Sequence, residues 1–103
     1  MTSIFELGFK VLAHGELQGI ATALQMPDIS CQLVNFKAVN DNPSNVYIGR
    51  SSSVTVVTAS TNTTAGWELD AGEETGWLPC ANLNEFYRIC DATGDDLVYI
   101  CVG

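Results

Sequence analysis

The chain has 103 residues, of which 47% are hydrophobic and 16% charged, so it suits one folded domain and is not a disordered segment. Its 12 acidic and 4 basic residues give a formal net charge of −8, which repels phosphate and excludes nucleic acids and anionic membranes as expected partners. No apolar run approaches the roughly 20 residues that span a bilayer, and the first residues lack a secretory signal, so we expect synthesis in a cytoplasm.

The first thirty residues carry two strand-like runs. Apolar residues occupy every second position within the run from Ile4 to Leu12, which is the period of a strand. A helix is disfavoured there, because Gly8 and Gly15 each weaken it by about 1 kcal/mol relative to alanine. A second strand is predicted from Leu17 to Leu24, and Pro27 ends it because proline cannot donate to a sheet ladder.

The middle of the chain alternates between β-rich runs and turn formers. Between Cys31 and Val39, apolar residues alternate with polar ones, which predicts a half-buried strand. Residues 40–45 are dense in asparagine, aspartate and proline, which favours a turn. Three further strands are predicted at Val46–Ile48, Val54–Thr58 and Trp67–Asp70.

The last two predicted strands are Glu85–Cys90 and Leu97–Val102, and both are rich in aromatic and β-branched residues. Between them lies the polar, glycine-containing stretch Asp91–Asp96, which predicts a hairpin. Eight or nine short runs with turns at short intervals indicate an all-β, single-domain sandwich or jelly roll. Within it, residues 1–30 are an extended N-terminal arm or the first strands, and residues 31–103 form the β-sandwich body.

The four cysteines allow three disulfide pairings, but each lies beside apolar residues in a strand-like run. Since no secretory signal is evident, we expect reduced, buried cysteines in preference to disulfides. Their spacing does not match a zinc site, which uses pairs close together in the sequence. These residues are Cys31, Cys80, Cys90 and Cys101.

The sequence offers no constellation that predicts catalysis. His14 is the single histidine, and it has no cysteine or serine partner in a recognisable pattern. No glycine-rich phosphate loop is present, so no cofactor is expected. Two acidic clusters are either calcium ligands or solvated loops, and the loops are favoured because the spacing fits no EF-hand. The clusters are Asp70, Glu73 and Glu74, and Asp91, Asp95 and Asp96.

Five stretches carry a resemblance that extends from about Cys31 to the C-terminal residue. They are Val46-Tyr47-Ile48-Gly49, Val54-Thr55, Gly66-Trp67-Glu68-Leu69-Asp70-Ala71-Gly72, Asn82-Leu83-Asn84-Glu85-Phe86-Tyr87 and Gly94-Asp95-Asp96-Leu97-Val98-Tyr99-Ile100. In their order and spacing these stretches resemble small virion proteins of tailed bacteriophages, which include capsid cement or decoration proteins with a jelly-roll or sandwich body.

The resemblance implies a mechanical role in the virion. Such a cement protein, made in the host cytoplasm, binds the capsid exterior across neighbouring major capsid subunits, often as a homotrimer, and stabilises the head without catalysis. Two other readings remain open: a neck, tail or fibre component of the virion, and a carbohydrate-binding β-sandwich.

Aromatic residues are the candidates for the contact surface, because aromatic side chains are enriched in the cores of protein interfaces. For each one, a place in the folded core is an equally good interpretation. The candidate interface residues are Phe5, Phe9, Trp67, Trp77, Phe86 and Tyr87.

Overall fold

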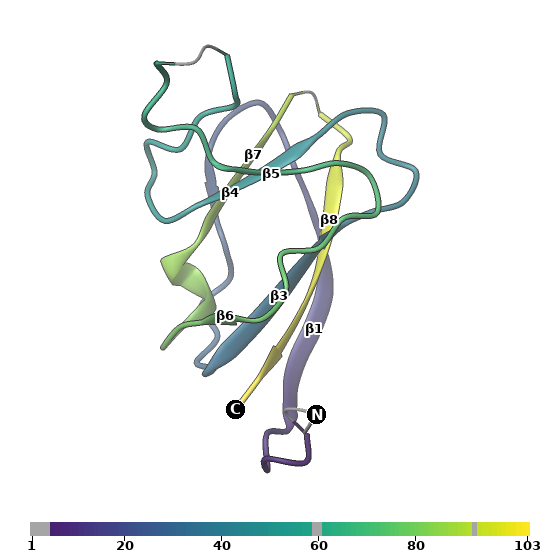
Figure 1. Ribbon diagram of the computed structural model, residues 1–103, viewed down its shortest axis with the longest axis vertical. Helices are drawn as coiled ribbons and strands as arrows, with labels where there is room; N and C mark the ends of the chain where they lie inside the picture. The colour runs from purple at the N-terminus through teal and green to yellow at the C-terminus, as the bar shows by residue number, and fades with distance from the viewer. Residues whose placement is uncertain (1–4, 59–60, 92) are drawn as a thin grey trace.

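The computed structural model describes residues 5–58, 61–91 and 93–103, which form two antiparallel four-stranded sheets (Figure 1). The first sheet holds, in spatial order, β1 (Val11–Gln18), β8 (Asp96–Val102), β3 (Leu33–Ala38) and β6 (Leu78–Pro79). The second holds β2 (Leu24–Gln25), β7 (Tyr87–Cys90), β4 (Val46–Gly49) and β5 (Trp67–Leu69). One 3-10 helix, η1 (Leu83–Glu85), precedes β7. The predicted all-β sandwich is confirmed.

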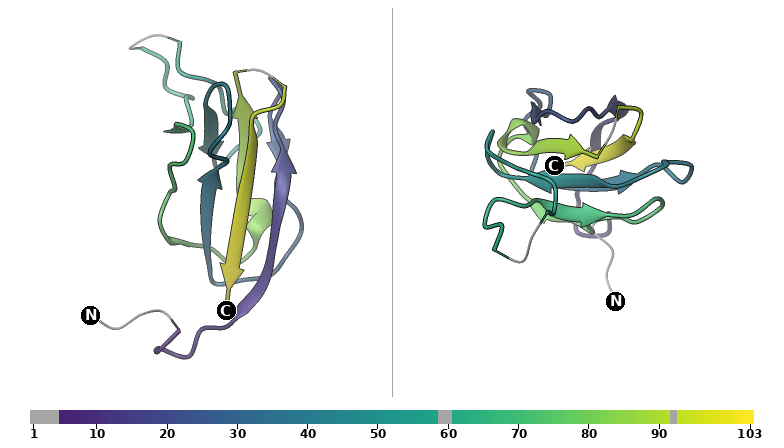
Figure 2. Two further views of the ribbon diagram at one scale, coloured as in Figure 1. Left: turned by 90° about the vertical axis from the view of Figure 1, so that its right-hand side faces the viewer. Right: turned by 90° about the horizontal axis from the view of Figure 1, so that it is seen from above.

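The strand pairing is nested along the chain. The first strand pairs with the last, β2 with β7, β3 with β6, and β4 with β5. A long hairpin that is rolled up into two facing sheets has this order, which is that of a jelly roll. As a result β1 and β2 lie along one side of the sandwich, and β5 and β6 lie along the other (Figure 2).

The core lies between the two sheets. On β3, Val34, Phe36 and Ala38 are fully buried, as their alternation with polar residues predicts. The ring of Phe36 meets the ring of Phe86 edge to face, with centroids 5.4 Å apart and planes at 72°. This aromatic pair joins the first sheet to the segment that leads into β7.

The predicted hairpin between the last two strands is wrong. Strand β7 lies in the second sheet between β2 and β4, whereas β8 lies in the first sheet between β1 and β3. The chain therefore passes from the second sheet to the first between β7 and β8. Turn residues indicate only that the chain changes direction and not whether the flanking strands pair. Here the rolled topology places these consecutive strands in opposite sheets.

The first strand begins later than the sequence predicts. Strand β1 starts at Val11 and runs to Gln18, while Phe5 to Gly8 form a turn closed by the Gly8 N–H donating to the Phe5 carbonyl at 3.1 Å. Gly8 has a positive φ of 95°, which favours glycine and interrupts the alternating pattern. The expected strand from Leu17 to Leu24 reduces to the ends of β1 and β2. Ile4 lies outside the described residues.

The predicted strand Val54–Thr58 is also wrong, since only Thr55 forms an isolated bridge, to Ala65. The side chain of Asn62 bonds the Val56 carbonyl at 2.9 Å and offers the backbone an alternative to a sheet ladder. Val54 itself packs so closely on β4 that a Cβ added to Gly49 would lie 2.5 Å from its Cγ2.

No helix in the described ranges is long and apolar enough to cross a membrane.

Candidate functional site

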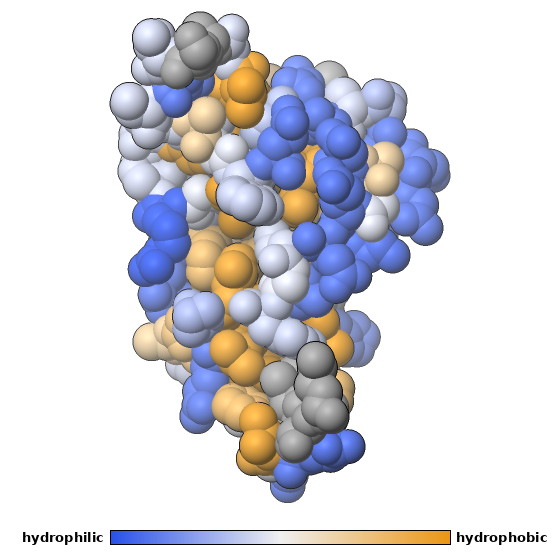
Figure 3. Space-filling view, in the orientation of Figure 1, coloured by the Kyte–Doolittle hydropathy of each residue, from blue (hydrophilic) through white to orange (hydrophobic). Residues whose placement is uncertain are grey.

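A groove opens between the edges of the two sheets, on the side where β5 and β6 lie. We call it the edge groove; its volume is about 410 Å³, and Figure 3 looks onto the band of apolar side chains that contains it. Most of its lining side chains are apolar, which suits the binding of an apolar partner group. It is lined by Ile48, Gly49, Arg50, Trp67, Thr75, Leu78, Pro79 and Phe86.

Trp67 stands at the rim of the edge groove with 70% of its surface exposed. It pairs with Ile48 in the β4–β5 ladder, and it projects from the same face of β5 as Leu69, which is only 1% exposed. The core thus covers one end of this strand face and leaves the other open. An exposed tryptophan beside an apolar hollow is a typical anchor for a protein partner.

The opposite wall of the edge groove consists of the segment before β6, which is hydrogen-bonded to β3 at the edge of the first sheet. The Thr75 hydroxyl oxygen accepts the Phe36 N–H at 3.1 Å, and the Thr75 N–H donates to the Phe36 carbonyl at 2.8 Å. Gly76 follows with a positive φ of 77°. The chain therefore follows β3 before the regular pairing of β6 begins, and this path places Thr75 and Leu78 along the groove.

Arg50 supplies the charge at the groove. Its Nη2 lies 3.1 Å from Oε1 of Glu85, with the two side chains 66% and 29% exposed, and its guanidinium carbon lies 5.4 Å from the Phe86 ring centroid. A pair this exposed contributes little to folding. Its effect is to hold a cation over an aromatic ring at the rim.

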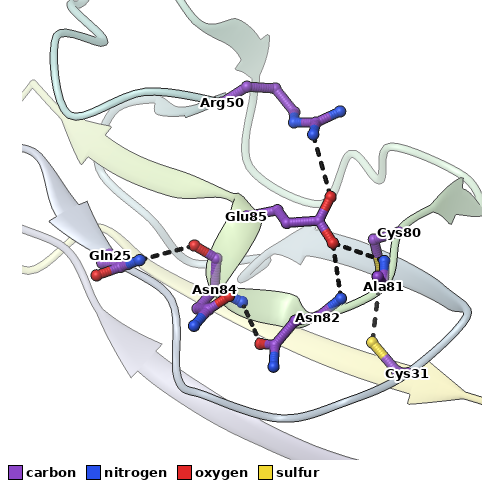
Figure 4. A network of polar contacts seen from close by, with 8 residues as sticks. All are labelled: Gln25, Cys31, Arg50, Cys80, Ala81, Asn82, Asn84 and Glu85. Atoms are coloured by element: carbon purple, nitrogen blue, oxygen red, sulfur yellow. Dashed lines mark hydrogen bonds and ion pairs between the residues drawn. The ribbon is translucent and has the colours of Figure 1, made fainter.

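A capping box fixes Glu85 beneath this cation (Figure 4). Its Oε2 accepts the N–H groups of Ala81 at 2.6 Å and Asn82 at 2.7 Å, and the Asn82 side chain in turn accepts the Asn84 N–H at 2.9 Å. These two backbone N–H groups, with Arg50 as a smaller cause, hold the pKa of Glu85 below its ordinary value. The box orders η1 and so positions Phe86 at the groove.

The thiols of Cys31 and Cys80 lie near this network, with their Sγ atoms 3.4 Å apart (Figure 4). Burial, and then the hydrogen bond with Cys80, raise the pKa of the Cys31 thiol to about 12. Burial also raises the pKa of Cys80. Such thiols are poor nucleophiles, because the thiolate is the reactive form.

The candidate interface residues fall at separate places. Trp67 and Phe86 both line the edge groove. Phe86 is only 5% exposed and also belongs to the core. Trp77 and Tyr87 are half-buried and do not line the groove. Phe9 is half-buried and Phe5 is 50% exposed, close to the N-terminal end.

A second apolar surface lies at that end of the molecule. We call residues 5–12 the N-terminal segment; four of the six exposed large hydrophobic residues in the described chain belong to it. The other two are Val57 and Trp67. The four are Phe5 (50% exposed), Leu7 (66%), Val11 (46%) and Leu12 (52%).

The acidic clusters serve structural contacts. Glu73 accepts the Asp70 N–H at 2.8 Å, and Glu74 accepts a hydrogen bond from the Asn35 side chain at 2.9 Å. Asp95 is fully buried and accepts both the N–H and the hydroxyl of Ser44. Within residues 5–58, 61–91 and 93–103, no three histidine, cysteine or acidic side chains come together in a way that could hold a metal ion.

Sequence reasoning named two of the eight described groove residues and missed the other six, among them Arg50, Thr75 and Leu78. Arg50 was visible as one of only 4 basic residues, placed directly after a β-rich run. Thr75 and Leu78 carried no signal, because their place depends on how the stretch before β6 follows β3.

No protein-family model, no curated protein and no solved structure matches the chain. The function is therefore argued from the site itself: an apolar hollow, an exposed tryptophan and a paired cation, which together suit the binding of protein side chains.

Proposed function

We propose that the chain is a structural protein of a tailed-bacteriophage virion, a capsid cement protein that binds the outside of the head. In this role it binds across neighbouring major capsid subunits as a homotrimer and opposes their separation, and it needs no catalysis and no cofactor. Trp67, exposed at the rim of the edge groove, is the observation that carries the proposal.

Two further features support a role in protein contacts. The N-terminal segment leaves Leu7 66% exposed, which gives the chain a second apolar surface at a different place from the edge groove. Two such surfaces let one small domain make two separate protein contacts, with capsid subunits or with other copies in the trimer. The jelly roll itself supports the proposal only weakly, since the same fold serves many functions.

The net charge of −8 supports a place on the outside of the particle. An acidic surface is repelled by packaged DNA, so the exterior is the more favourable side of the shell. The same charge keeps free copies dispersed until an apolar contact of suitable shape overcomes the repulsion.

The test uses empty heads of the phage whose genome encodes the chain, prepared without this protein. We expect the purified chain to co-sediment with these heads and to raise the temperature at which they break. Trp67→Asp should weaken binding by tenfold or more, and Val57→Ser, which changes an exposed apolar residue away from the groove, should bind normally. A chain with no affinity for the heads would contradict the proposal.

Where the chain lies in the particle distinguishes cement from a neck, tail or fibre component. Imaging of the intact virion should show its density over junctions between capsid subunits. Density confined to the neck, the tail or the fibres would contradict the cement role and leave a virion role in place.

One observation favours a second candidate, a carbohydrate-binding domain. Trp67 offers an exposed ring beside Arg50 and Thr75, and sugar rings stack on aromatic faces with polar groups nearby. A glycan array, read for binding that Trp67→Ala abolishes, tests this candidate. Micromolar binding of a glycan through Trp67 would favour it over cement.

A further inference from the structure

We propose that the edge groove receives the N-terminal segment of a second copy of this chain, with Phe5 and Leu7 packing beside Trp67. The inference rests on the proposed function in one respect, that the edge groove binds protein, and it deepens that function by naming the partner. Its test uses free protein without capsids, so the two proposals fail separately.

Complementary shape is the first argument. The edge groove is a concave apolar surface of about 410 Å³, and its rim residue Trp67 is 70% exposed. Phe5 and Leu7 are 50% and 66% exposed on a turn that precedes β1. Large apolar side chains exposed next to one another mark contact surfaces, and a groove of this size accommodates a few of them.

Charge is the second argument. Two copies that each carry a net charge of −8 repel one another over most of their surfaces. The N-terminal segment carries one acid, Glu6, and one base, Lys10, so its own formal charge is zero. Of the described residues that line the edge groove, Arg50 alone is charged, and its ion pair with Glu85 beside the groove leaves this region close to neutral. This contact therefore joins two of the least acidic parts of the molecule.

The path of the segment in its own chain is the third argument. Lys10 and Gly103 exchange two backbone hydrogen bonds of 3.0 Å, which hold the segment at the β1 edge of the first sheet. Strand β1 is at one end of that sheet and β6 at the other. None of the described residues that line the edge groove belongs to the segment of the same chain, so the groove of one copy is open to the segment of another.

The two surfaces differ, so the contact is head to tail. Each copy offers one segment and one groove, and a head-to-tail contact closes into a ring when its rotation permits. A ring of three copies is the homotrimer that the cement proposal includes.

The experiment compares four full-length proteins by sedimentation velocity across micromolar concentrations. They are the unaltered chain, a segment variant (Phe5→Ser with Leu7→Ser), a groove variant (Trp67→Asp) and the control Val57→Ser. We expect the unaltered chain and the control to associate, and each of the other two variants to sediment as a monomer. All of the substituted side chains are at least half exposed, so circular dichroism should show an intact fold.

Mixing the two monomeric variants is the decisive step. The segment variant keeps an intact groove and the groove variant keeps an intact segment, so an equimolar mixture should form a dimer and stop there. A mixture that stays monomeric, with both proteins folded, would overturn the proposal. A monomeric unaltered chain, or association that both variants preserve, would also overturn it.

Tryptophan fluorescence provides a measurement on the unaltered chain itself. Dilution of the unaltered chain should shift its emission to longer wavelength as Trp67 becomes exposed to water, and Trp67→Phe should remove the shift. Emission that is unchanged on dissociation would count against the contact. A monomer that still binds capsids overturns this inference and the homotrimer of the proposed function but leaves capsid binding in place, and a ring that fails to bind capsids overturns the proposed function alone.

Discussion

The Sγ atoms of Cys31 and Cys80 lie 3.4 Å apart at the place where the pairing of β3 with β6 continues beyond the regular strands. The Cys80 N–H donates to the Gln32 carbonyl at 3.0 Å, and the Cys31 N–H donates to the Ala81 carbonyl at 3.3 Å. These bonds extend a strand of only two residues. The thiol pair thus lies where the first sheet holds one wall of the edge groove.

The first prediction concerns these two thiols. Because burial raises the pKa of both, and that of Cys31 to about 12, few thiolates exist near neutral pH. We expect iodoacetamide to modify Cys31 and Cys80 far more slowly in the native chain than in the unfolded chain. Mass spectrometry of tryptic peptides over time measures the two rates. Rapid native modification of Cys31 would show that the thiol is more exposed or more acidic than the structure has it.

The second prediction concerns the capping box. The pKa of Glu85 is lower in the folded chain than its ordinary value of 4.5. The ionised Glu85 carboxylate therefore stabilises the fold at pH values above 4.5, and this stabilisation is lost as the pH falls through the pKa of Glu85 in the folded chain. Glu85→Gln keeps an oxygen for the box but removes the charge, so it should melt at lower temperature near neutral pH. The difference from the unaltered chain should disappear in acid.

Melting curves between neutral pH and about pH 3, the range in which carboxylates titrate, measure this effect. Glu16→Gln is the control, since Glu16 is an exposed acid on β1. A gap between Glu85→Gln and the unaltered chain that persists in acid would contradict the electrostatic account.

The third prediction concerns Arg88, which is 9% exposed on β7. Its Nε donates to the Gln18 carbonyl and its Nη1 to the Gln25 carbonyl, each at 3.1 Å. The side chain therefore joins the ends of β1 and β2. Arg88→Met leaves both carbonyls without this donor and should lower the free energy of unfolding by about 2–3 kcal/mol.

Urea unfolding followed by tryptophan fluorescence measures the loss at Arg88. Arg50→Met is a matched control, because Arg50 is 66% exposed and its ion pair should contribute less than about 1 kcal/mol. Equal losses at the two arginines would contradict the role assigned to burial.

The fourth prediction concerns Asp95, a fully buried carboxylate directly before β8 that bonds to Ser44 in the 40–45 turn. It accepts the Ser44 N–H at 2.9 Å and the Ser44 hydroxyl. Asp95→Asn removes the negative charge that strengthens both hydrogen bonds, so we expect a loss of about 1–3 kcal/mol. Ser44→Ala removes only the hydroxyl and should cost less. In urea unfolding the double variant should lose less than the sum of the two, and strict additivity would contradict a direct coupling.

The regular strands were largely visible in the sequence, because their side chains alternate with a period of two. Strand β3 lies within the predicted run from Cys31 to Val39, and its apolar face is the buried one. The stretch from Val54 to Thr58 shows the limit of that reasoning. Its β-branched residues favour a strand, but in the folded chain the Asn62 side chain donates to the Val56 carbonyl, a contact outside any sheet ladder.

The candidate site was only partly predictable. Trp67 was named because tryptophan is frequent at interfaces, and the structure places it at the rim of the edge groove. Trp77 was named for the same reason and does not line the groove. Composition does not tell the two apart, because the groove forms from the edges of both sheets, which only the rolled topology brings together.

The position of β8 in the middle of the first sheet has a consequence for the order of folding. Strands β1 and β3 both pair with β8 and not with each other, so the sheet has no centre until residues 96–102 have been synthesised. A nascent chain that has reached only β7 carries two unpaired strand edges and is prone to aggregate. Truncation before β8 would therefore leave only the short β3–β6 pairing in the first sheet.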